Sequence, residues 1–347
     1  MGGTRVISLG VIGCGAWGPN HIRVFNALPE SRVVAAVDPD AERLARAGSL
    51  HPALRLEREA GPVLDDHGID AVVVATPTST HYELVRRALV AGKHVLAEKP
   101  LAQTVAEARE LGRLARERER VLLVGHVFLF NAGIVKLKEE LDAGAVGEPL
   151  FLSAVRTNLG PIRSDVNAAY DLATHDLSIF NWLLGRAPEL ASATGASFLQ
   201  PGVEDVVAVS LKYPADVFAT IQASWLNPKK VRQITVVGRR GMMVWDDLEL
   251  SNPVGVYDKR AEAQPAYSDY GEFLRISMSD GEVRFPTVEL EEPLRTQGRA
   301  FLAAIRDGDT DGRAGTDEAI EVARSLEAIE RSLRAEGAPV VLTRGER

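Results

Sequence analysis

The stretch VISLGVIGCGAWGPN, residues 6–20, joins a short apolar run to a glycine-rich turn. The run predicts a buried β-strand, and the residues after the turn have the pattern of a helix. Between them stands a G-x-G-x-x-G pattern formed by Gly13, Gly15 and Gly18. Such glycines permit a tight turn and let backbone N–H groups approach a pyrophosphate at the positive end of the helix. The turn residues that we expect to contact a dinucleotide are Gly13, Cys14, Gly15, Ala16 and Trp17.

A glycine pattern alone is a weak signal, so its surroundings decide its meaning. From Val6 to Gly125 short apolar runs alternate with amphipathic stretches of helical character. The runs cover residues 6–12, 32–38, 70–76, 93–98 and 120–125. Apolar strands separated by helices predict a parallel sheet covered on both faces, which is an α/β fold. We therefore predict a Rossmann domain that binds NAD over residues 1–125 and a second domain over residues 126–347.

The second apolar run ends in an acidic residue, Asp38. A carboxylate at this point of a Rossmann domain accepts hydrogen bonds from the adenosine ribose hydroxyls and repels a 2′-phosphate. Asp40 adds to that repulsion, so the sequence favours NAD over NADP. Two alternatives stay open. Arg43 could bind the 2′-phosphate, and Asp38 could instead be the N-cap of the helix that follows.

The stretch ATPTSTHYE, residues 75–83, follows another predicted strand. Thr76, Pro77 and Thr78 should lie at the carboxyl edge of the sheet, where ligands bind in such folds. His81 is a further candidate contact to the cofactor. Ser79 or Thr80 also fits the N-cap of the next helix.

A carboxylate and an imidazole are one helical turn apart in YDLATHDLSIFNWLLG, residues 170–185. Asp171 and His175 stand at i and i+4 of a predicted helix, which places their Cβ atoms roughly 6 Å apart. The apolar stripe of that helix is Ala173, Leu177, Phe180 and Leu184, on nearly the opposite side. The pair could be solvated, as polar residues of surface helices usually are, or it could face a substrate.

Four further stretches carry a family resemblance. They are AEKPLA (97–102), VGHVFLFN (124–131), DLATHD (171–176) and EEPLRTQGRAFLAAIRDG (291–308). Together with the glycine pattern, they make nearly the whole chain resemble the family of glucose–fructose oxidoreductase, inositol dehydrogenase and MocA-like enzymes. The resemblance implies an α+β second domain with an open, mainly antiparallel sheet and helices on one face. It also implies a homodimer or homotetramer formed through that sheet.

The resemblance further implies the roles of the catalytic residues. Lys99 and His175 would face the reacting carbon, with Asp171 beside the histidine. Oxidation of a secondary alcohol removes a hydroxyl proton, and a histidine with an ordinary pKa of ~6.5 can take it near neutral pH. Lys99 can stabilise the developing alkoxide, or polarise a carbonyl in the reverse direction.

Several residues are weaker candidates or have no role that the sequence indicates. Glu98 and His126 would line the nicotinamide pocket, although either could be a buried polar group with ordinary partners. His21, His51 and His67 have no partner that the sequence identifies. No His/Asp/Glu cluster with ligand spacing occurs, so we predict no metal site.

The candidate substrate-binding residues are Lys99, Asn131, Arg156, Asn158, Arg163, Tyr170, Asp171, His175 and Trp225. Aromatic and amide groups suit a sugar, and cationic groups suit a diphosphate or a carboxylate. The basic stretch SWLNPKKVR, residues 224–232, fits a charged hairpin turn equally well. The stretches NLGPIR and SWLNPKKVRQITVVG are most similar to family members of nucleotide-sugar metabolism.

Three functions follow from the resemblance. The first is oxidation at C3 of a nucleotide-linked hexose, either a UDP-N-acetylhexosamine or its uronate. The second is dehydrogenation of inositol or a free sugar, or reduction of a ketosugar. The third is a non-catalytic regulator that senses NAD, which predicts loss of Lys99, Asp171 or His175; all three are present.

The composition limits the possible partners and the compartment. The formal net charge of −8 argues against binding to DNA or RNA. No apolar run approaches the ~18 residues of a membrane span, and the N-terminal apolar stretch is too short for a signal peptide. Cys14 is the only cysteine, so no intrachain disulfide can form. We expect a cytoplasmic protein.

Overall fold

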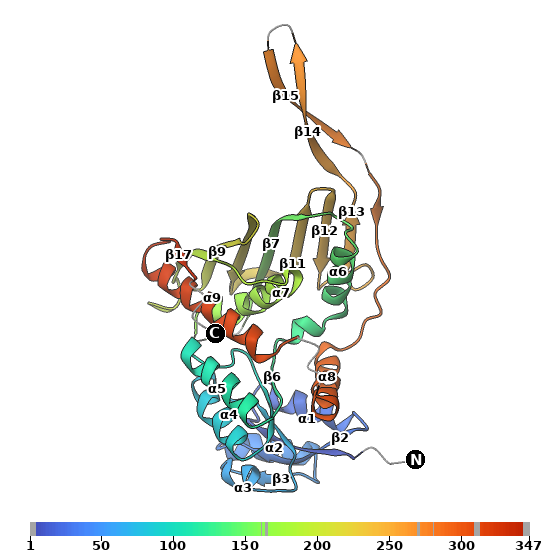
Figure 1. Ribbon diagram of the computed structural model, residues 1–347. Helices are drawn as coiled ribbons and strands as arrows, with labels where there is room; N and C mark the ends of the chain where they lie inside the picture. The colour runs from blue at the N-terminus through green and yellow to red at the C-terminus, as the bar shows by residue number, and fades with distance from the viewer. Residues whose placement is uncertain are drawn as a thin grey trace. The chain divides into compact units, whose positions relative to one another are not determined.

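The computed structural model of the protein is shown in Figure 1. It describes residues 5–160, 162–163, 166–268, 271–279, 281–308 and 313–342, with side chains for all of these except residues 260–280. The chain divides into two compact units, residues 1–131 with 291–327 and residues 132–290 with 328–347. Residues 291–327, which were predicted to belong to the second domain, thus cluster with the first unit.

A six-stranded parallel sheet forms the centre of the first unit, in the order β3-β2-β1-β4-β5-β6. Its strands are β1 (Ile7–Ile12), β2 (Ser31–Val37), β3 (Arg55–Glu57), β4 (Ala71–Val74), β5 (His94–Ala97) and β6 (Leu122–Val124). The predicted parallel sheet is confirmed. β3 was not predicted because it is three residues long and mostly exposed, and so has no apolar run.

The helical segments of the first unit connect and cover these strands. They are α1 (Gly18–Asn26), α2 (Ala41–Leu50), α3 (Gly61–Leu64), η1 (Thr78–Thr80), α4 (His81–Val90), α5 (Val105–Glu117), η2 (Val127–Phe130) and α8 (Pro293–Asp307). α8 returns to this unit because its apolar face packs on α1, where Phe301 contacts Phe25 edge to face. α9 (Thr316–Arg334) begins in the first unit and ends in the second.

The second unit contains a nine-stranded sheet, in the order β16-β13-β12-β11-β7-β10-β9-β8-β17. Its strands are β7 (Pro149–Leu159), β8 (Leu190–Ala196), β9 (Val206–Tyr213), β10 (Val217–Ser224), β11 (Leu226–Gly238), β12 (Gly241–Asp246), β13 (Val254–Tyr257), β16 (Val283–Arg284) and β17 (Val340–Val341). All neighbours are antiparallel except β7 and β10. This confirms the predicted mainly antiparallel sheet. β14 (Arg260–Ser268) and β15 (Gly271–Ser279) form a separate antiparallel pair.

One face of this large sheet carries helices. α6 (Ala132–Asp142) and α7 (Thr174–Leu184), preceded by the π-helical turn η3 (Ala169–Ala173), lie on the same side of it (Figure 1). Burial alternates along β10 as its sequence predicts, with Ala219 and Ile221 buried and Phe218 and Gln222 exposed. The opposite face of the sheet therefore carries the exposed side chains.

The region predicted as a possible charged hairpin has a different connection. β10 and β11 both pair with β7, one on each side of it, so they are not neighbours and form no hairpin. The register between β11 and β7 shifts between Leu226 and Val231, and residues 227–230 are exposed there. Within the described part of the chain, no helix has the length and apolar character needed to cross a bilayer.

Candidate active site

The turn between β1 and α1 requires glycine at two of its three glycine positions. Gly13 has a φ of +99°, and a Cβ added there would lie 2.5 Å from the Ala75 carbonyl oxygen. A Cβ on Gly18 would lie 1.9 Å from the Gly13 carbonyl oxygen. Gly15 differs, because a Cβ there would meet only a guanidinium nitrogen of Arg43, at 3.9 Å. Gly13 and Gly18 are thus needed for the turn itself, and Gly15 leaves open space beside it.

Asp38 lies against this turn and is only 3% exposed. Its carboxylate accepts hydrogen bonds from the backbone N–H of Cys14 at 2.7 Å and from that of Asp40 at 2.9 Å. The N-cap of α2 is Asp40, which accepts from Glu42 and Arg43, so the N-cap alternative for Asp38 is wrong. Burial, and next the Asp38 carboxylate, raise the pKa of the Cys14 thiol to about 11. Cys14 is therefore a neutral thiol and no nucleophile.

His81 connects two loops at the carboxyl ends of the strands. Its ring nitrogens lie 2.9 Å from the Thr76 carbonyl oxygen and 2.8 Å from that of Pro100. Thr80 stands at the N-cap position of α4, but its hydroxyl contacts Thr76 and Pro77 instead of capping the helix. Both ring nitrogens of His81 contact backbone carbonyls. The geometry therefore favours a structural role for His81, holding the two loops together, over a direct contact with the cofactor.

Glu98, Lys99 and His126 follow the neighbouring strands β5 and β6 at the same edge. The Glu98 carboxylate lies 2.7 Å from the Nε2 of His21, a residue of α1 that is 1% exposed. Burial, and next the charge of Lys99, lower the pKa of His126 to about 4, so this histidine is neutral near pH 7. This partner of His21 was not predicted, because Glu98 is 77 residues away along the chain.

In the second unit, Asp171 is held by two side chains. Trp225 donates its indole N–H to Oδ2 at 3.2 Å, and Arg163 donates to Oδ1 at 3.3 Å. Trp225 is 1% exposed, so it offers little surface to a substrate. The predicted regular helix is corrected in one respect: Asp171 lies in the π-helical turn, and His175 is in the first turn of α7. Such π-turns occur frequently at functional sites.

The helix α7 is buried on more sides than its apolar stripe predicts. Asp176 and Arg156 form a bidentate ion pair, with N–O distances of 2.6 to 3.1 Å, and both side chains are buried. Asn181 accepts from the Tyr213 hydroxyl at 3.0 Å. At 3% exposure Arg156 has almost no surface for a ligand, so we do not retain it as a substrate contact. Asn131, Asn158, Arg163 and Tyr170 are partly exposed.

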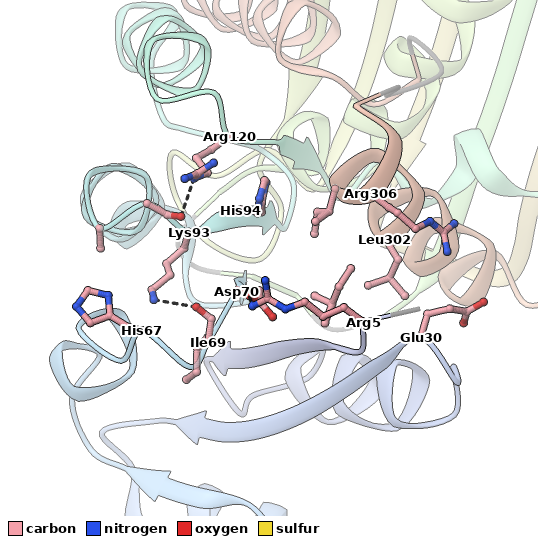
Figure 2. A pocket seen from close by; sticks show the side chains of 14 residues that line it. Arg5, Glu30, His67, Ile69, Asp70, Lys93, His94, Arg120, Leu302 and Arg306 are labelled. Carbon is pink, nitrogen blue, oxygen red and sulfur yellow. Dashed lines mark hydrogen bonds and ion pairs between the residues drawn. The ribbon is translucent and has the colours of Figure 1, made fainter. Parts of the chain in front are cut away.

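A separate cavity of about 580 Å³ lies at the opposite, amino-terminal edge of the parallel sheet (Figure 2). Several cations line it, but they bind acceptors of the protein. Lys93 donates to the carbonyl oxygens of Asp66 and Ile69, Arg120 donates to that of Gly92, and Arg5 pairs with Asp70. Ligands of parallel α/β sheets bind outside the carboxyl ends of the strands, so this cavity is not the candidate site.

Comparison with protein families matches both units. Residues 7–126 match the model described as "Oxidoreductase family, NAD-binding Rossmann fold", and residues 134–244 match the "GFO/IDH/MocA C-terminal domain". The chain belongs to the GFO/IDH/MocA oxidoreductase family. The resemblance predicted from the sequence motifs is confirmed.

Individual proteins are similar to this chain to different extents. Inositol 2-dehydrogenase 2 of Saccharopolyspora erythraea is 37% identical over 193 residues, which are 54% of this chain and 56% of that relative. Inositol 2-dehydrogenase 2 of Paenarthrobacter aurescens is 28% identical over 95% of this chain and 97% of its own length. The crystal structure of GenD2 from gentamicin A biosynthesis, in complex with NAD, has a TM-score of 0.82 at 26% identity and covers 98% of this chain and 97% of that one.

The residues of the first unit fit the NAD that its Rossmann domain implies. The turn of Gly13, Gly15 and Gly18 opens α1, whose N–H groups suit a pyrophosphate. Asp38 uses one lone pair on each carboxylate oxygen for the backbone, which leaves acceptor capacity for ribose hydroxyls. Within the described residues both ring nitrogens of buried His126 lack a hydrogen-bond partner, so an amide of the nicotinamide would find one there.

We expect NADP to bind at least about tenfold more weakly than NAD, a difference of about 1.4 kcal/mol. A 2′-phosphate would meet the carboxylates of Asp38 and Asp40. Arg43 is the cation that could bind it, but its guanidinium lies 3.5 Å from the Asp40 carboxylate. Calorimetric titration with both cofactors measures the difference. Asp40→Asn is the matched control, because asparagine still caps α2 without the charge; equal affinities of the wild type for NAD and NADP would refute the role of Asp38.

Proposed function

We propose that this chain is an NAD-dependent dehydrogenase that oxidises a secondary alcohol of a sugar or polyol. Family membership supports the reaction class. The environment of Asp171 is the observation that carries the proposal. One carboxylate oxygen accepts from Trp225 and the other from Arg163, one turn before His175. A carboxylate fixed one turn before a histidine can orient the imidazole and stabilise its protonated form, which suits the histidine to act as a general base.

In the proposed mechanism, His175 takes the proton of the substrate hydroxyl. Asp171 stabilises the imidazolium that forms and keeps the ring in one orientation. The ammonium of Lys99 stabilises the alkoxide oxygen from which the proton has left. When bound, NAD supplies the nicotinamide that accepts the hydride.

The similar proteins favour a polyol or a free sugar as substrate, because two of those compared above are inositol 2-dehydrogenases. The nucleotide-linked hexose predicted first from the sequence is therefore our second candidate. One observation supports it. Lys229 and Lys230 lie exposed at the irregularity of β11, four and five residues after the partner of Asp171, where two ammonium groups could bind a diphosphate.

A substrate panel separates the two candidates. With NAD and the purified protein, we expect NADH formation with an inositol or a free aldose and at least about tenfold lower kcat/KM with UDP- and TDP-hexoses, a difference of about 1.4 kcal/mol. Absorbance of NADH measures every member of the panel. Lys229→Ala combined with Lys230→Ala is the internal control, since it should lower kcat/KM only for nucleotide sugars. Preference for a nucleotide sugar, lost in that double variant, would reverse the order of the candidates.

The homodimer or homotetramer predicted through the second unit's sheet stays a prediction. Its support is the sheet face opposite α6 and α7, where Phe151 and Phe218 stack with ring centroids 5.8 Å apart and Phe218 is 41% exposed. Sedimentation equilibrium of the whole chain would measure the assembly, and a monomer at micromolar concentration would refute it.

A further inference from the structure

The β8–β9 loop, residues 197–205, has a tip whose form follows from its sequence. Pro201 and Gly202 occupy the two central positions of a turn in which the N–H of Val203 donates to the Gln200 carbonyl oxygen at 3.1 Å. Gly202 has a φ of +78°, as a type II turn requires at its third position, and proline suits the position before it. The tip of the loop is therefore a tight turn with a defined backbone.

Asp205 holds the first part of the same loop. Its side chain is fully buried, and its Oδ2 accepts from the backbone N–H of Phe198 at 2.6 Å and from that of Leu199 at 2.9 Å. The other carboxylate oxygen, Oδ1, is buried and has no hydrogen-bond partner within the described residues. One oxygen of Asp205 thus binds both amides, and the second oxygen makes no hydrogen bond that holds the loop.

Two contacts join the β8–β9 loop to the residues that hold Asp171. Gln200 donates through Nε2 to the carbonyl oxygen of Arg163 at 3.4 Å, and Arg163 donates to the Asp171 carboxylate. The carbonyl oxygen of Asp205 accepts from the backbone N–H of Trp225 at 3.0 Å, and the indole of Trp225 donates to the other oxygen of the Asp171 carboxylate. Both partners of Asp171 are therefore also partners of the loop.

Glu204, near the end of the loop, contacts the residues that lead into η3. Its carbonyl oxygen accepts from the N–H of Ala168 at 2.9 Å, and its Oε2 accepts from Nδ2 of Asn167 at 2.9 Å. These two residues directly precede η3, which contains Asp171. The loop is thus fixed to the chain at several points shortly before the carboxylate that the proposed mechanism uses.

Two apolar side chains of this fixed loop face solvent. Phe198 is 70% exposed and Leu199 is 51% exposed. Fixing a loop costs conformational entropy, and here the contacts that offset this cost hold two apolar side chains in water. Apolar side chains displayed on a fixed loop are typical of a binding surface. The C–H faces of a sugar or polyol ring pack on aromatic and aliphatic side chains, which line most small-molecule sites.

We infer that Phe198 and Leu199 form an apolar wall for the substrate beside Asp171, and that Asp205 is the positioning residue that holds this wall in place. The substrate is the sugar or polyol of the proposed function, so the role of the wall rests on that function. The hold of Asp205 on the loop does not. Part of the substrate specificity is thereby assigned to a loop that carries no catalytic group.

Amide hydrogen exchange tests the role of Asp205 without cofactor or substrate. Asp205→Ala removes the acceptor of two backbone N–H groups, so the amides of Phe198 and Leu199 should exchange about tenfold faster or more. Asp205→Asn keeps one oxygen that accepts from both amides, and its nitrogen replaces the oxygen that makes no hydrogen bond. Exchange in this variant should stay within about threefold of the wild type. Mass spectrometry of peptides that span the loop measures the rates, and peptides of β10 report any general loss of stability.

Steady-state kinetics tests the contact with the substrate. A side chain that binds the substrate without taking part in the chemistry affects KM and leaves kcat nearly unchanged. We expect Phe198→Ala to raise KM for the sugar or polyol by about fivefold or more, with kcat and the Kd of NAD within about threefold. Asp205→Ala should raise KM similarly because it releases the loop, and Asp205→Asn should keep KM within about twofold. Phe285→Ala is the matched control, since it truncates a phenylalanine that is 52% exposed elsewhere in the second unit and should leave KM unchanged.

The outcomes separate this inference from the proposed function. If the wild type oxidises no sugar or polyol, the proposed function fails, and the exchange rates still decide whether Asp205 holds the loop. An active wild type with an unchanged KM in Phe198→Ala would overturn the wall, and wild-type exchange rates in Asp205→Ala would overturn the role of Asp205. Sedimentation equilibrium tests a second copy of the chain as the occupant of this surface. Dissociation of Phe198→Ala at unchanged KM would assign the two side chains to that contact and would also overturn the inference.

Discussion

Replacing His175 by alanine is expected to lower kcat by about 10²- to 10⁴-fold, the usual contribution of a positioned general base. The Kd of NAD should stay within about threefold, since the residues that we expect to bind the dinucleotide belong to the first unit. Alanine leaves a space where the imidazole was, so added imidazole should restore part of the activity. Steady-state kinetics of NADH formation, with and without imidazole, measures both effects.

Two further variants show whether the loss belongs to the base. His67→Ala removes an exposed histidine of the first unit and should leave kcat within about twofold, as surface substitutions generally do. Asp171→Asn keeps an oxygen that can accept from Trp225 but removes the charge that stabilises an imidazolium. It should therefore lower kcat by less than His175→Ala does. Full activity of His175→Ala would show that His175 is not the general base, and it would refute the proton-transfer step of the proposed function.

The parts of this site that the sequence predicts are those whose physics is local. The glycine turn is such a case, because Gly13 has a positive φ and a Cβ on Gly18 would lie 1.9 Å from the Gly13 carbonyl oxygen, so both requirements arise within residues 13–18. The parallel strands are another, since an apolar run of four to seven residues can be recognised without its neighbours. Motifs of this kind also carried the family resemblance.

The parts that the sequence did not predict depend on contacts between distant residues. His21 and Glu98 are 77 residues apart, and Trp225 and Asp171 are 54 apart. Nothing near Trp225 in the sequence indicates that its indole N–H holds a carboxylate instead of facing a sugar. Arg156 was assigned to a substrate for the same reason, because its partner Asp176 was known only as a residue of the next helix.

The order of strands in the second sheet explains the remaining difference. Two strand-like runs that follow each other in the sequence, as β10 and β11 do, ordinarily pair with each other. Here β7 separates them, so the basic segment between residues 226 and 231 lies at a register shift beside β7 and not at the tip of a hairpin. Strand order is a property of the whole sheet, and it cannot be predicted from the alternation of apolar residues within one strand.

Two glycine-to-alanine substitutions in the same turn should both weaken NAD binding but differ in their effect on stability. Gly18→Ala places a Cβ 1.9 Å from the Gly13 carbonyl oxygen, a backbone atom that cannot move without opening the turn. We expect it to lower the free energy of unfolding by about 1–3 kcal/mol, as overpacking does. The Kd of NAD should rise by roughly 100-fold or more, equivalent to about 2.8 kcal/mol.

Gly15→Ala should leave the fold intact and still weaken NAD. Its Cβ meets only an Arg43 nitrogen at 3.9 Å, and its φ lies outside the left-handed region. Alanine there should leave the free energy of unfolding unchanged or raise it by up to about 1 kcal/mol, because alanine restricts the unfolded chain. The same methyl group would occupy the space through which a pyrophosphate approaches the backbone, so the Kd of NAD should rise by about tenfold or more. Urea unfolding and calorimetric titration of both variants measure the two quantities separately. If Gly15→Ala bound NAD like the wild type, the pyrophosphate would not lie in the open space beside the turn, because a ligand in contact with that backbone would clash with the added methyl group.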